Sequence, residues 1–600
     1  MKPSVFVGMM HSAIKRFKED DNRPHKAGAE DNPERDWRTL LASEKRSHII
    51  MGFIVVVLMV CLGKIATLQL FQSSDVEANG QQFYHYAVTR SIPAKRGQIL
   101  DRQGKVLANS ELCHTIWGNP QKIRESGLAK ELARVTQAPR KEFANRMKSD
   151  RRNVLVAKCV GEKAYEDVRA LKIDGLTYEK DYKRVYPGGP VSAQVVGMVG
   201  REGGGLEGVE SFADEALAGH DGQRGILRIP GGKVLEELWR QEGVDGKNLV
   251  LSIDSRIQTI AMEALQASVE RHDANAGSAI VVDISNGEVL ALASWPSYDP
   301  NDRTHIEYDH VRNRVVTDMF EPGSTMKPFA IAKALDDGIV TPETIVGTHP
   351  GKIQIEDRII GDTHDYGDLS VSQVIAKSSN VGTVRISMLL PSVTLWKMYN
   401  ELGFGQRPEI EVPGATVGKL RPVQKWGPVE HATISYGYGV SVSLAQLARA
   451  YTAFARGGDV IPLTVFKTGK EHIDGTRVFS EKTADEVLDM MRLTVLSGGT
   501  ASRLKIEGYT TAGKTGTAYK VKNGAYDKKA YVGSFVGIAP ATRPKIVAAV
   551  MIDEPKKAGH VGGVVATPVY KEIVERALNV LNVPQDNSQT LALNTKGAKP

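Results

Sequence analysis

The chain has 600 residues, far more than a small binding module or a disulfide-stabilised peptide requires. Hydrophobic residues make up 41% of the sequence and charged residues 24%, which predicts a folded, globular protein. The net charge of +7 is small for this length and forms no long basic run with interleaved aromatic residues, so nucleic acid is disfavoured as a partner.

The three cysteines are Cys61, Cys113 and Cys159, and none lies in a CxxC pair or in a Cys/His spacing of the zinc type. We therefore predict neither a metal site nor another cofactor. At most one disulfide can form, and the spacing does not indicate whether Cys113 and Cys159 pair.

Residues 1–48 are polar and of mixed charge, and we expect them to be a mobile tail. Residues 49–71 are apolar apart from Lys64 and would be about 34 Å long as a helix, enough to cross a bilayer. Four Lys or Arg residues lie within twenty residues before this segment and one lies within twenty after it. This asymmetry predicts a cytoplasmic amino terminus and places residues 72–600 outside the cytoplasmic membrane.

Residues 72–245 alternate short strand-like and helical stretches with Gly-rich turns, which predicts a separate α+β module. A second domain is expected over residues 246–583. It should begin with a strand, an acidic helix cap and a long amphipathic helix, followed by a hairpin that turns at Asn286 and Gly287. It should end with two apolar strands and a helix capped by Thr567. Residues 584–600 have no apolar period and are predicted to be a disordered tail.

The strongest candidate for catalysis is the S-x-x-K motif formed by Ser324 and Lys327. A helix that begins near Gly323 places a hydroxyl and a candidate base on one face, and Pro328 is compatible only with the first turn of that helix. Backbone N–H groups at a helix amino end favour the oxyanion that forms when a serine attacks a carbonyl.

Lysine can accept a proton from serine at neutral pH only if its pKa is lowered by burial or by a second cation. Downstream residues could supply what is missing: Ser378 a relay hydroxyl, Asn380 an amide for the substrate backbone, and Lys514 the second cation. Lys514 with Thr515 and Thr517 also forms a candidate carboxylate pocket. Gly516 would let a substrate strand approach the protein backbone closely.

Similar motifs occur elsewhere in the chain. S-x-x-K recurs at Ser12–Lys15, on the predicted cytoplasmic side, and at Ser502–Lys505, which has no S-x-N before the next K-T-G. A second K-T-G starts at Lys467 and continues into a polar, turn-like stretch instead of a strand. Only the ordered set at Ser324, Ser378 and Lys514 has all three motifs, a set typical of penicillin-binding proteins and class A β-lactamases.

At these residues the chain resembles the class B penicillin-binding proteins, most closely those of the FtsI type, which act in cell division. The similarity also includes RGQILDRQGKVLA from Arg96, GREGGGLEGVE from Gly200 and SYGYG from Ser435. The resemblance implies an α+β multidomain chain: a non-catalytic pedestal, or dimerisation, domain and a transpeptidase domain with a five-stranded antiparallel sheet flanked by helices.

The resemblance also implies a mechanism. Ser324 is acylated by the penultimate D-alanine of a peptidoglycan stem peptide, Lys327 is the base, Ser378 relays protons, and the N–H groups of Ser324 and Thr517 form the oxyanion hole. An amine of a neighbouring stem peptide then attacks the acyl-enzyme. Expected partners are stem peptides, β-lactams, a lipid II polymerase of the FtsW type and other division proteins, at the inner membrane.

Several alternatives stay open. An elongation-specific transpeptidase would share the same motifs. A D,D-carboxypeptidase or β-lactamase would deliver water to the acyl-enzyme; the E-x-x-L-N match at Glu575–Asn579 follows K-T-G on the expected final helix, where we predict a surface Glu and core Ala and Leu. A penicillin-sensing scaffold is disfavoured by the intact motifs. The absence of an E-D-x-x-F sequence between residues 72 and 245 disfavours a glycosyltransferase.

Overall fold

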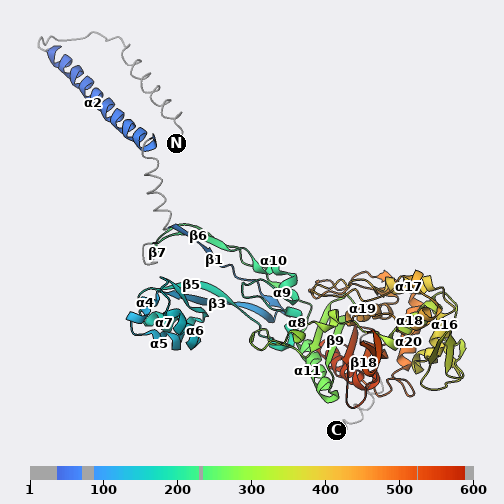
Figure 1. The fold of residues 1–600 in the computed structure, drawn as a ribbon. Coiled ribbons are helices and arrows are strands. Elements are labelled where there is room, and N and C mark those ends of the chain that lie inside the picture. The colour runs from blue at the N-terminus through green and yellow to red at the C-terminus, as the bar shows by residue number, and fades with distance from the viewer. Residues whose placement is uncertain (1–36, 71–86, 229–233, 523, 588–600) are drawn as a thin grey trace, which may run out of the picture. The chain divides into compact units, whose positions relative to one another are not determined.

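The structure, a computed structural model, describes residues 37–70, 87–228, 234–522 and 524–587 (Figure 1). The chain divides into two units, residues 1–88 and residues 89–600.

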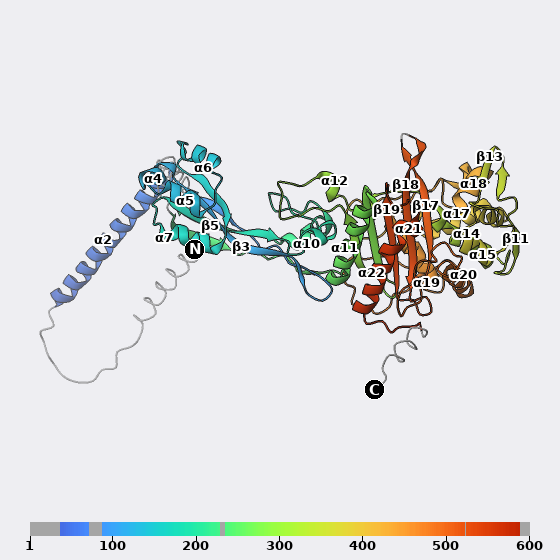
Figure 2. The ribbon, with the colours of Figure 1, turned by 90° about the horizontal axis from the view of Figure 1, so that it is seen from below.

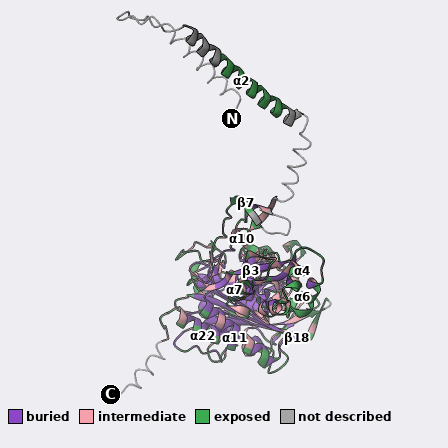
Figure 3. Ribbon diagram, turned by 90° about the vertical axis from the view of Figure 1, so that its left-hand side faces the viewer, coloured by how far each residue is buried: buried purple, intermediate pink, exposed green. Residues whose placement is uncertain are grey.

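The first unit contains helix α2, Trp37–Leu70. Its segment His48–Ala66 is long and apolar enough to cross a membrane, and its side chains are exposed throughout, unlike those of the strands (Figure 3). The helix begins before the expected start at residue 49, so residues 37–48 are helical instead of forming part of a mobile tail. The segment WRTLLASEKR contains good helix formers and neither Gly nor Pro, which explains the extension.

In the second unit, residues 89–250 form the pedestal. Its larger sheet has the order β4-β3-β2-β8, with β5 paired to β3. These strands are β2 Ile99–Leu100, β3 Val106–Gly118, β4 Val154–Val160, β5 Leu176–Val185 and β8 Leu249–Val250. The helices that follow them are α4 Pro120–Glu125, α5 Ala129–Val135, α6 Arg140–Met147 and α7 Glu162–Ala170. Ile116, Leu132, Phe143 and Val156 are buried in a core of their own between this sheet and helices.

Cys113 of β3 and Cys159 near the end of β4 form a disulfide, which answers the question that their spacing left open. Their Cα atoms are 4.9 Å apart because the two strands pair in the sheet. Cys61 of α2 is exposed and free.

The remaining pedestal elements are a second sheet and short helices. The sheet has the order β1-β6-β7, with β1 Ala87–Ile92, β6 Gly222–Arg228 and β7 Val234–Gln241. The helices are η2 Gly189–Val191, α8 Ala193–Val196, α9 Gly208–Phe212 and α10 Asp214–Ala218. Glu210 of α9 is fully buried, and its two carboxylate oxygens each lie 2.6 Å from an arginine, Arg96 or Arg184.

The RGQILDRQGKVLA segment lies where the pedestal meets the second domain. Strand β2 within it pairs in parallel with β8, so the strand expected to open the second domain instead extends the pedestal sheet. Asp101 accepts a hydrogen bond of 2.7 Å from the Ser255 hydroxyl at the start of the next helix. Arg102 lies 3.5 Å from Glu288. These contacts couple the two domains through the segment.

The second domain is built around a sheet with the order β10-β9-β19-β18-β17, in which every neighbouring pair is antiparallel (Figure 2). Its described strands are β9 Ala276–Asp283, β10 Val289–Trp295, β17 Ala512–Lys522, β18 Ala525–Ala539 and β19 Ile546–Asp553. The expected five-stranded antiparallel sheet is confirmed.

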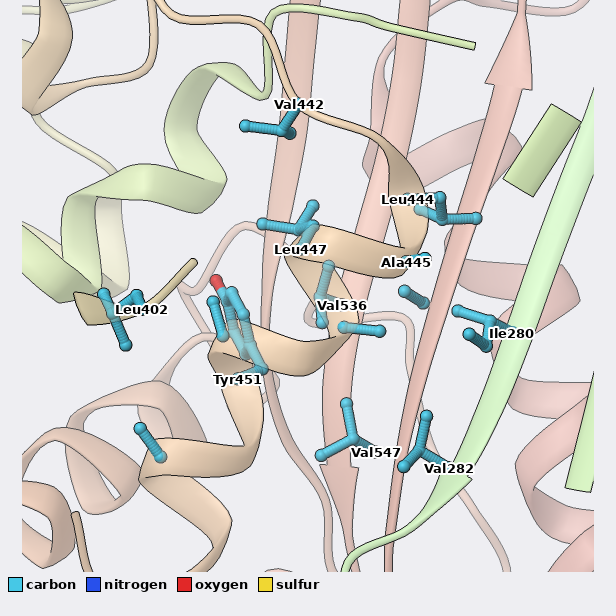
Figure 4. Packing of buried hydrophobic residues seen from close by; sticks show 14 of the residues in the cluster. Ile280, Val282, Leu402, Val442, Leu444, Ala445, Leu447, Tyr451, Val536 and Val547 are labelled. Carbon is cyan, nitrogen blue, oxygen red and sulfur yellow. The ribbon is translucent and has the colours of Figure 1, made fainter. Parts of the chain in front are cut away.

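Alternation along the strands creates two apolar faces. Ile280 and Val282 of β9, Val536 of β18 and Val547 of β19 point to one side, where Leu447 and Tyr451 of helix α19 cover them (Figure 4). Their neighbours, including Val281 and Phe535, belong to a second core that α11 and α22 cover. The three helices are α11 Ser255–His272, α19 Leu444–Ala455 and α22 Thr567–Val580.

The remaining elements of this domain include a group of helices that lies beside the sheet, on the right of Figure 1. The helices and turns are α12 Tyr308–Val311, α13 Arg314–Thr317, η3 Gly323–Met326, α14 Lys327–Asp336, α15 Val371–Lys377, α16 Asn380–Ser387, α17 Ser392–Glu401, η4 Val423–Lys425, α18 Pro428–Ser435, α20 Glu481–Leu493 and α21 Gly562–Val565. The short strands are β11 Ile345–Gly347, β12 Lys352–Ile355, β13 Arg358–Gly361, β14 Asp368–Ser370, β15 Asp459–Val460 and β16 Thr476–Arg477.

Most of the helix caps and turns expected in this domain are present. Asp254 caps α11 by accepting from the Arg256 N–H, and the β9–β10 hairpin turns at Gly287, whose φ is +74°. The expected Thr567 cap is wrong: Ala566 precedes α22, and the Thr567 hydroxyl donates to the Gly562 carbonyl at 3.2 Å.

The packed chain also extends beyond Val583, into the start of the expected tail. Asp586 accepts a hydrogen bond of 2.7 Å from the Thr510 N–H, and its carboxylate also accepts from the Thr510 and Thr542 hydroxyls. Residues 588–600 lie outside the described residues.

Candidate active site

Ser324 lies in the 3-10 turn η3, which continues directly into α14 at Lys327. The α-helix therefore begins four residues later than expected, although Ser324 and Lys327 keep the spacing of three residues that places them on one helical face. The turn is held from behind, because the Gly323 N–H donates to the Gly437 carbonyl at 3.1 Å. Gly437 has φ +90°, and a Cβ at that position would lie 2.1 Å from the Gly323 carbonyl oxygen. Only glycine fits there.

The two lysines of the motif set converge on one hydroxyl. Lys327 Nζ donates to Ser378 Oγ at 3.1 Å and also to the Ser378 carbonyl. Lys514 Nζ donates to the same Ser378 Oγ at 2.9 Å and to the Thr515 carbonyl at 3.2 Å. The structure thus brings together residues from η3–α14, the α15–α16 junction and β17.

Both ammonium groups are fully buried, which disfavours their charged forms. Burial lowers the pKa of Lys514 to about 7. The pKa of Lys327 lies well below its ordinary value, because its side chain is buried and because the charge of Lys514 is close by. Both shifts favour the neutral amine, and at Lys327 the charge of Lys514 adds to the effect of burial. A neutral lysine beside a serine can act as a base.

Ser378 is held in a strained backbone conformation at the end of α15. Its φ of +61° is left-handed, which is uncommon for a residue with a side chain. Ser379 then caps α16 by accepting from the Gly382 N–H. Two helix ends therefore meet at the S-x-N motif and fix its position.

Asp362, just after β13, anchors this motif. Its carboxylate accepts from the Ser379 hydroxyl at 2.5 Å, from the Val381 N–H at 3.1 Å and from the Asn380 N–H. Its charge also raises the pKa of Lys327, which opposes the effect of burial. No sequence motif indicates Asp362, whose contacts depend on β13 lying beside α16 in the fold.

The Asn380 amide, expected to face the substrate backbone, donates to the Gly361 carbonyl at 2.7 Å. No described residue bonds its side-chain oxygen. One end of the amide is thus held by β13, while the oxygen stays available as an acceptor.

Strand β17 forms an edge of the sheet and carries the K-T-G-T residues. A Cβ on Gly516 would lie 2.3 Å from Ser534 Oγ and 2.8 Å from the Pro322 carbonyl oxygen. Glycine is thus needed here because the turn that holds Ser324 lies against the strand. The sequence had suggested the approach of a substrate strand as the reason.

The two threonines of the motif have fixed hydroxyls. Thr517 Oγ1 accepts from the Gly562 N–H at 3.0 Å, so its own proton is free to donate to a ligand. The Thr515 hydroxyl donates to Thr500 Oγ1 at 3.1 Å, and Thr500 is a neighbour that the sequence did not indicate. The Lys514 ammonium and the Thr517 hydroxyl are donors suited to a carboxylate, and the Thr515 hydroxyl would have to turn from Thr500 to join them.

The repeated motifs lie elsewhere. Lys467 is exposed and donates to the Arg102 carbonyl at 2.9 Å, so it contacts the pedestal and not the Ser324 turn. Ser502 and Lys505 are exposed in a turn. Ser12 lies outside the described residues. On α22, Ala577 and Leu578 are buried as expected. Glu575 is half-buried, whereas a surface position was expected.

Two protein-family models match most of the chain and identify its class of protein. The family model described as "Penicillin binding protein transpeptidase domain" matches residues 277–575, and that described as "Penicillin-binding Protein dimerisation domain" matches residues 91–251. With the relatives below, these matches show that the chain belongs to the penicillin-binding proteins that combine the two domains.

Individual relatives identify the type of penicillin-binding protein. The chain is 39% identical to the probable peptidoglycan D,D-transpeptidase PenA of Neisseria gonorrhoeae, over 84% of this chain and 87% of the relative. It is 33% identical to the peptidoglycan D,D-transpeptidase FtsI of Escherichia coli K12, over 90% and 92%. The solved penicillin-binding protein 3 of Mycobacterium tuberculosis, complexed with aztreonam, is 27% identical with a TM-score of 0.65, over 83% and 98%. The expected resemblance to the FtsI type is confirmed.

Proposed function

We propose that this chain is a peptidoglycan D,D-transpeptidase in which Ser324 is the nucleophile. The observation that supports this most strongly is the Ser378 hydroxyl, held between Lys327 and Lys514 beside the Ser324 turn. The relatives named FtsI and PenA, which are described as D,D-transpeptidases, supply the reaction class.

In the proposed acylation, Lys327 accepts the proton of Ser324 as Oγ attacks the carbonyl of the penultimate D-alanine. The N–H groups of Ser324 and Thr517 would stabilise the oxyanion. Ser378 would return the proton to the departing D-alanine amine. Protonated Lys514, with the Thr515 and Thr517 hydroxyls, would hold the terminal carboxylate, and the Asn380 oxygen would accept from the substrate backbone.

In the second half-reaction an amine of another stem peptide attacks the acyl-enzyme. The C–N bond forms as the C–Oγ bond breaks, and Ser324 recovers a proton. A β-lactam would acylate the same serine, because its strained ring resembles the D-alanyl-D-alanine amide. The chain would thus be inhibited covalently by penicillins.

The location, partner and domain limits are part of the proposal. Helix α2 is apolar over His48–Ala66, which supports a single membrane span with residues 1–48 in the cytoplasm. The pedestal, expected over residues 72–245, would extend through β8 at Leu249–Val250, and the transpeptidase domain, expected over residues 246–583, would follow it. The similarity to FtsI favours division, with an FtsW-type lipid II polymerase as partner. A fluorescent fusion should concentrate at midcell, and an even side-wall signal would favour elongation.

The nucleophile is tested by labelling the full-length protein with fluorescent penicillin. Ser324→Ala should abolish the covalent label, whereas Ser502→Ala should retain it, because Ser502 lies in an exposed turn away from the lysine pair. Normal labelling of Ser324→Ala would refute the assignment. A cross-linked product formed from stem pentapeptides by wild-type protein, and absent with Ser324→Ala, would establish transpeptidation.

A further inference from the structure

A cleft of about 510 Å³ lies beside the nucleophile turn and has no part in the chemistry described above. Its lining includes one arginine of β13 and three tyrosines: Arg358, Tyr436, Tyr438 and Tyr526. The cleft is next to the reacting serine along the backbone, because Gly437, between two of these tyrosines, bonds the Gly323 N–H. A molecule that fills this cleft would therefore lie close to the turn that carries Ser324.

A carboxylate lies directly behind this cleft. Glu321 Oε1 accepts from the Gly439 N–H at 2.8 Å and from the Tyr526 hydroxyl at 3.1 Å, and both donors line the cleft. Its Oε2 is buried and has no hydrogen-bond partner among the residues that the structure describes. Burial raises the pKa of Glu321, although the charge of Lys419 opposes this. A buried carboxylate oxygen without a donor is costly, so a cation entering the cleft would be favoured.

The tyrosines in front of the carboxylate suit an ammonium group. The ring centroids of Tyr436 and Tyr438 are 5.6 Å apart, and those of Tyr438 and Tyr526 are 5.7 Å apart. The negative faces of clustered aromatic rings attract ammonium ions, and a nearby carboxylate adds to the attraction.

Arg358 adds a positive group to the same cleft. Its side chain is exposed, and it forms no ion pair with any described residue. Arg358 lowers and Glu321 raises the pKa of the Tyr436 hydroxyl by their charges, so opposite charges lie near this tyrosine. The other arginine of the cleft, Arg421, is paired with Glu430 at 3.1 Å.

We propose that this cleft binds an α-amino-acid zwitterion, with its ammonium against the tyrosines and Glu321 and its carboxylate on Arg358. This rests on the proposed function, since the side chain of a diaminopimelate residue in a stem peptide ends in such a zwitterion. The stem peptide could be the acyl donor or the acceptor.

If the stem peptide is the acceptor, the bound ammonium must become an amine before it reacts. It would give one proton to Glu321, and its nitrogen would attack the acyl carbon as the C–Oγ bond breaks. A second proton from nitrogen would go to Ser324 Oγ, and Glu321 would release its proton to water. The nitrogen keeps one hydrogen in the new amide, so atoms and charges balance.

The experiment uses the full-length protein and stem peptides that differ only in the third residue, meso-diaminopimelate or lysine, which lacks the side-chain carboxylate. The donor arm measures release of D-alanine from each pentapeptide. The acceptor arm starts from one acyl-enzyme, made with a simple thioester, and measures its partition between hydrolysis and attack by each tetrapeptide.

Wild type should prefer diaminopimelate about tenfold or more in at least one arm, because the lysine peptide lacks the carboxylate that forms a charge-assisted hydrogen bond with Arg358. The arm that shows the preference tells whether the cleft binds the donor or the acceptor peptide. Arg358→Ala should reduce the preference to about twofold or less, and Arg358→Lys should keep part of it. The control Arg407→Ala, at an exposed arginine outside the cleft, should retain the full preference. Glu321→Gln should weaken use of both peptides in that arm, because both have an ammonium group.

Equal use of the two peptides by wild type, or an undiminished preference in Arg358→Ala, would overturn the proposal. Penicillin labelling of the same preparations separates the two hypotheses. Labelled Ser324 without peptide preference would refute only the zwitterion site, whereas absence of label would refute the proposed function.

Discussion

Lys327 and Lys514 lie on opposite sides of a single oxygen, with Ser378 Oγ 3.1 Å from the first ammonium nitrogen and 2.9 Å from the second. Two buried like charges this close cannot both persist at neutral pH, so one lysine gives up its proton. The hydroxyl between them can accept from the charged lysine and donate to the neutral one. In the proposed mechanism, this geometry lets Lys327 act as the base and Lys514 hold the substrate carboxylate.

The two K-T-G sequences should respond very differently to mutation. Lys514→Ala should slow penicillin acylation by roughly ten- to a hundred-fold or more, because it removes a charge-assisted contact and the charge that lowers the pKa of Lys327. Lys467→Ala should change the rate by less than about threefold, since this exposed lysine contacts the pedestal backbone. The second-order acylation rate constants, with melting temperatures as the folding control, decide the matter; the reverse ranking would contradict the assignment.

Acylation should decrease as the pH rises through about 7. Below the pKa of Lys514, its ammonium holds the ligand carboxylate; above it, the neutral amine cannot. The pH profile of the second-order rate constant reports the free enzyme and should show this descending limb. In Lys514→Arg the limb should disappear from the range up to pH 10, because a guanidinium stays charged. A profile that stays flat to pH 9 in wild type would contradict a lowered pKa.

Asp362→Asn should affect both the position and the protonation of the site. The amide cannot accept all of the bonds from Ser379, Asn380 and Val381, so the maximal acylation rate should fall about tenfold or more. Removing the negative charge should lower the pKa of Lys327 further. Because acylation needs neutral Lys327, the acidic limb should move to lower pH. A fall in rate with no movement of that limb would limit Asp362 to a purely structural role.

Glu210→Ala should strongly destabilise the pedestal. It would leave Arg96 and Arg184, both largely buried, without the carboxylate that each contacts at 2.6 Å. Removing one partner of a buried ion pair costs about 3–5 kcal/mol in the free energy of unfolding. Glu215→Ala, at an exposed neighbour, should change stability by less than about 0.5 kcal/mol. Chemical denaturation of both variants measures the difference, and similar midpoints would contradict the buried network.

Local patterns in the sequence were enough to predict many elements. The apolar run of α2, the Asp254 cap, the turn at Gly287 and the strands β18 and β19 depend on neighbours in the chain, so their signals lie within short windows. Errors occurred at ends, as at Thr567, because whether a hydroxyl caps a helix or bonds a carbonyl depends on packing.

The candidate site residues could also be named from the sequence, because the proposed reaction needs a serine nucleophile, a lysine base and a second cation, and these residue types occur in three short, ordered motifs. The motif order and the strand residues after its K-T-G favoured Lys514 over Lys467 in the sequence, and the tertiary structure places Lys514 beside Ser378 and Lys467 against the pedestal. It alone showed Asp362 bonding the S-x-N motif, Gly516 fitting against Pro322, and Glu321 behind a cleft. Contacts between residues far apart in the chain, and the burial that lowers the pKa of a lysine, have no local sequence pattern, because they arise only when distant segments pack together.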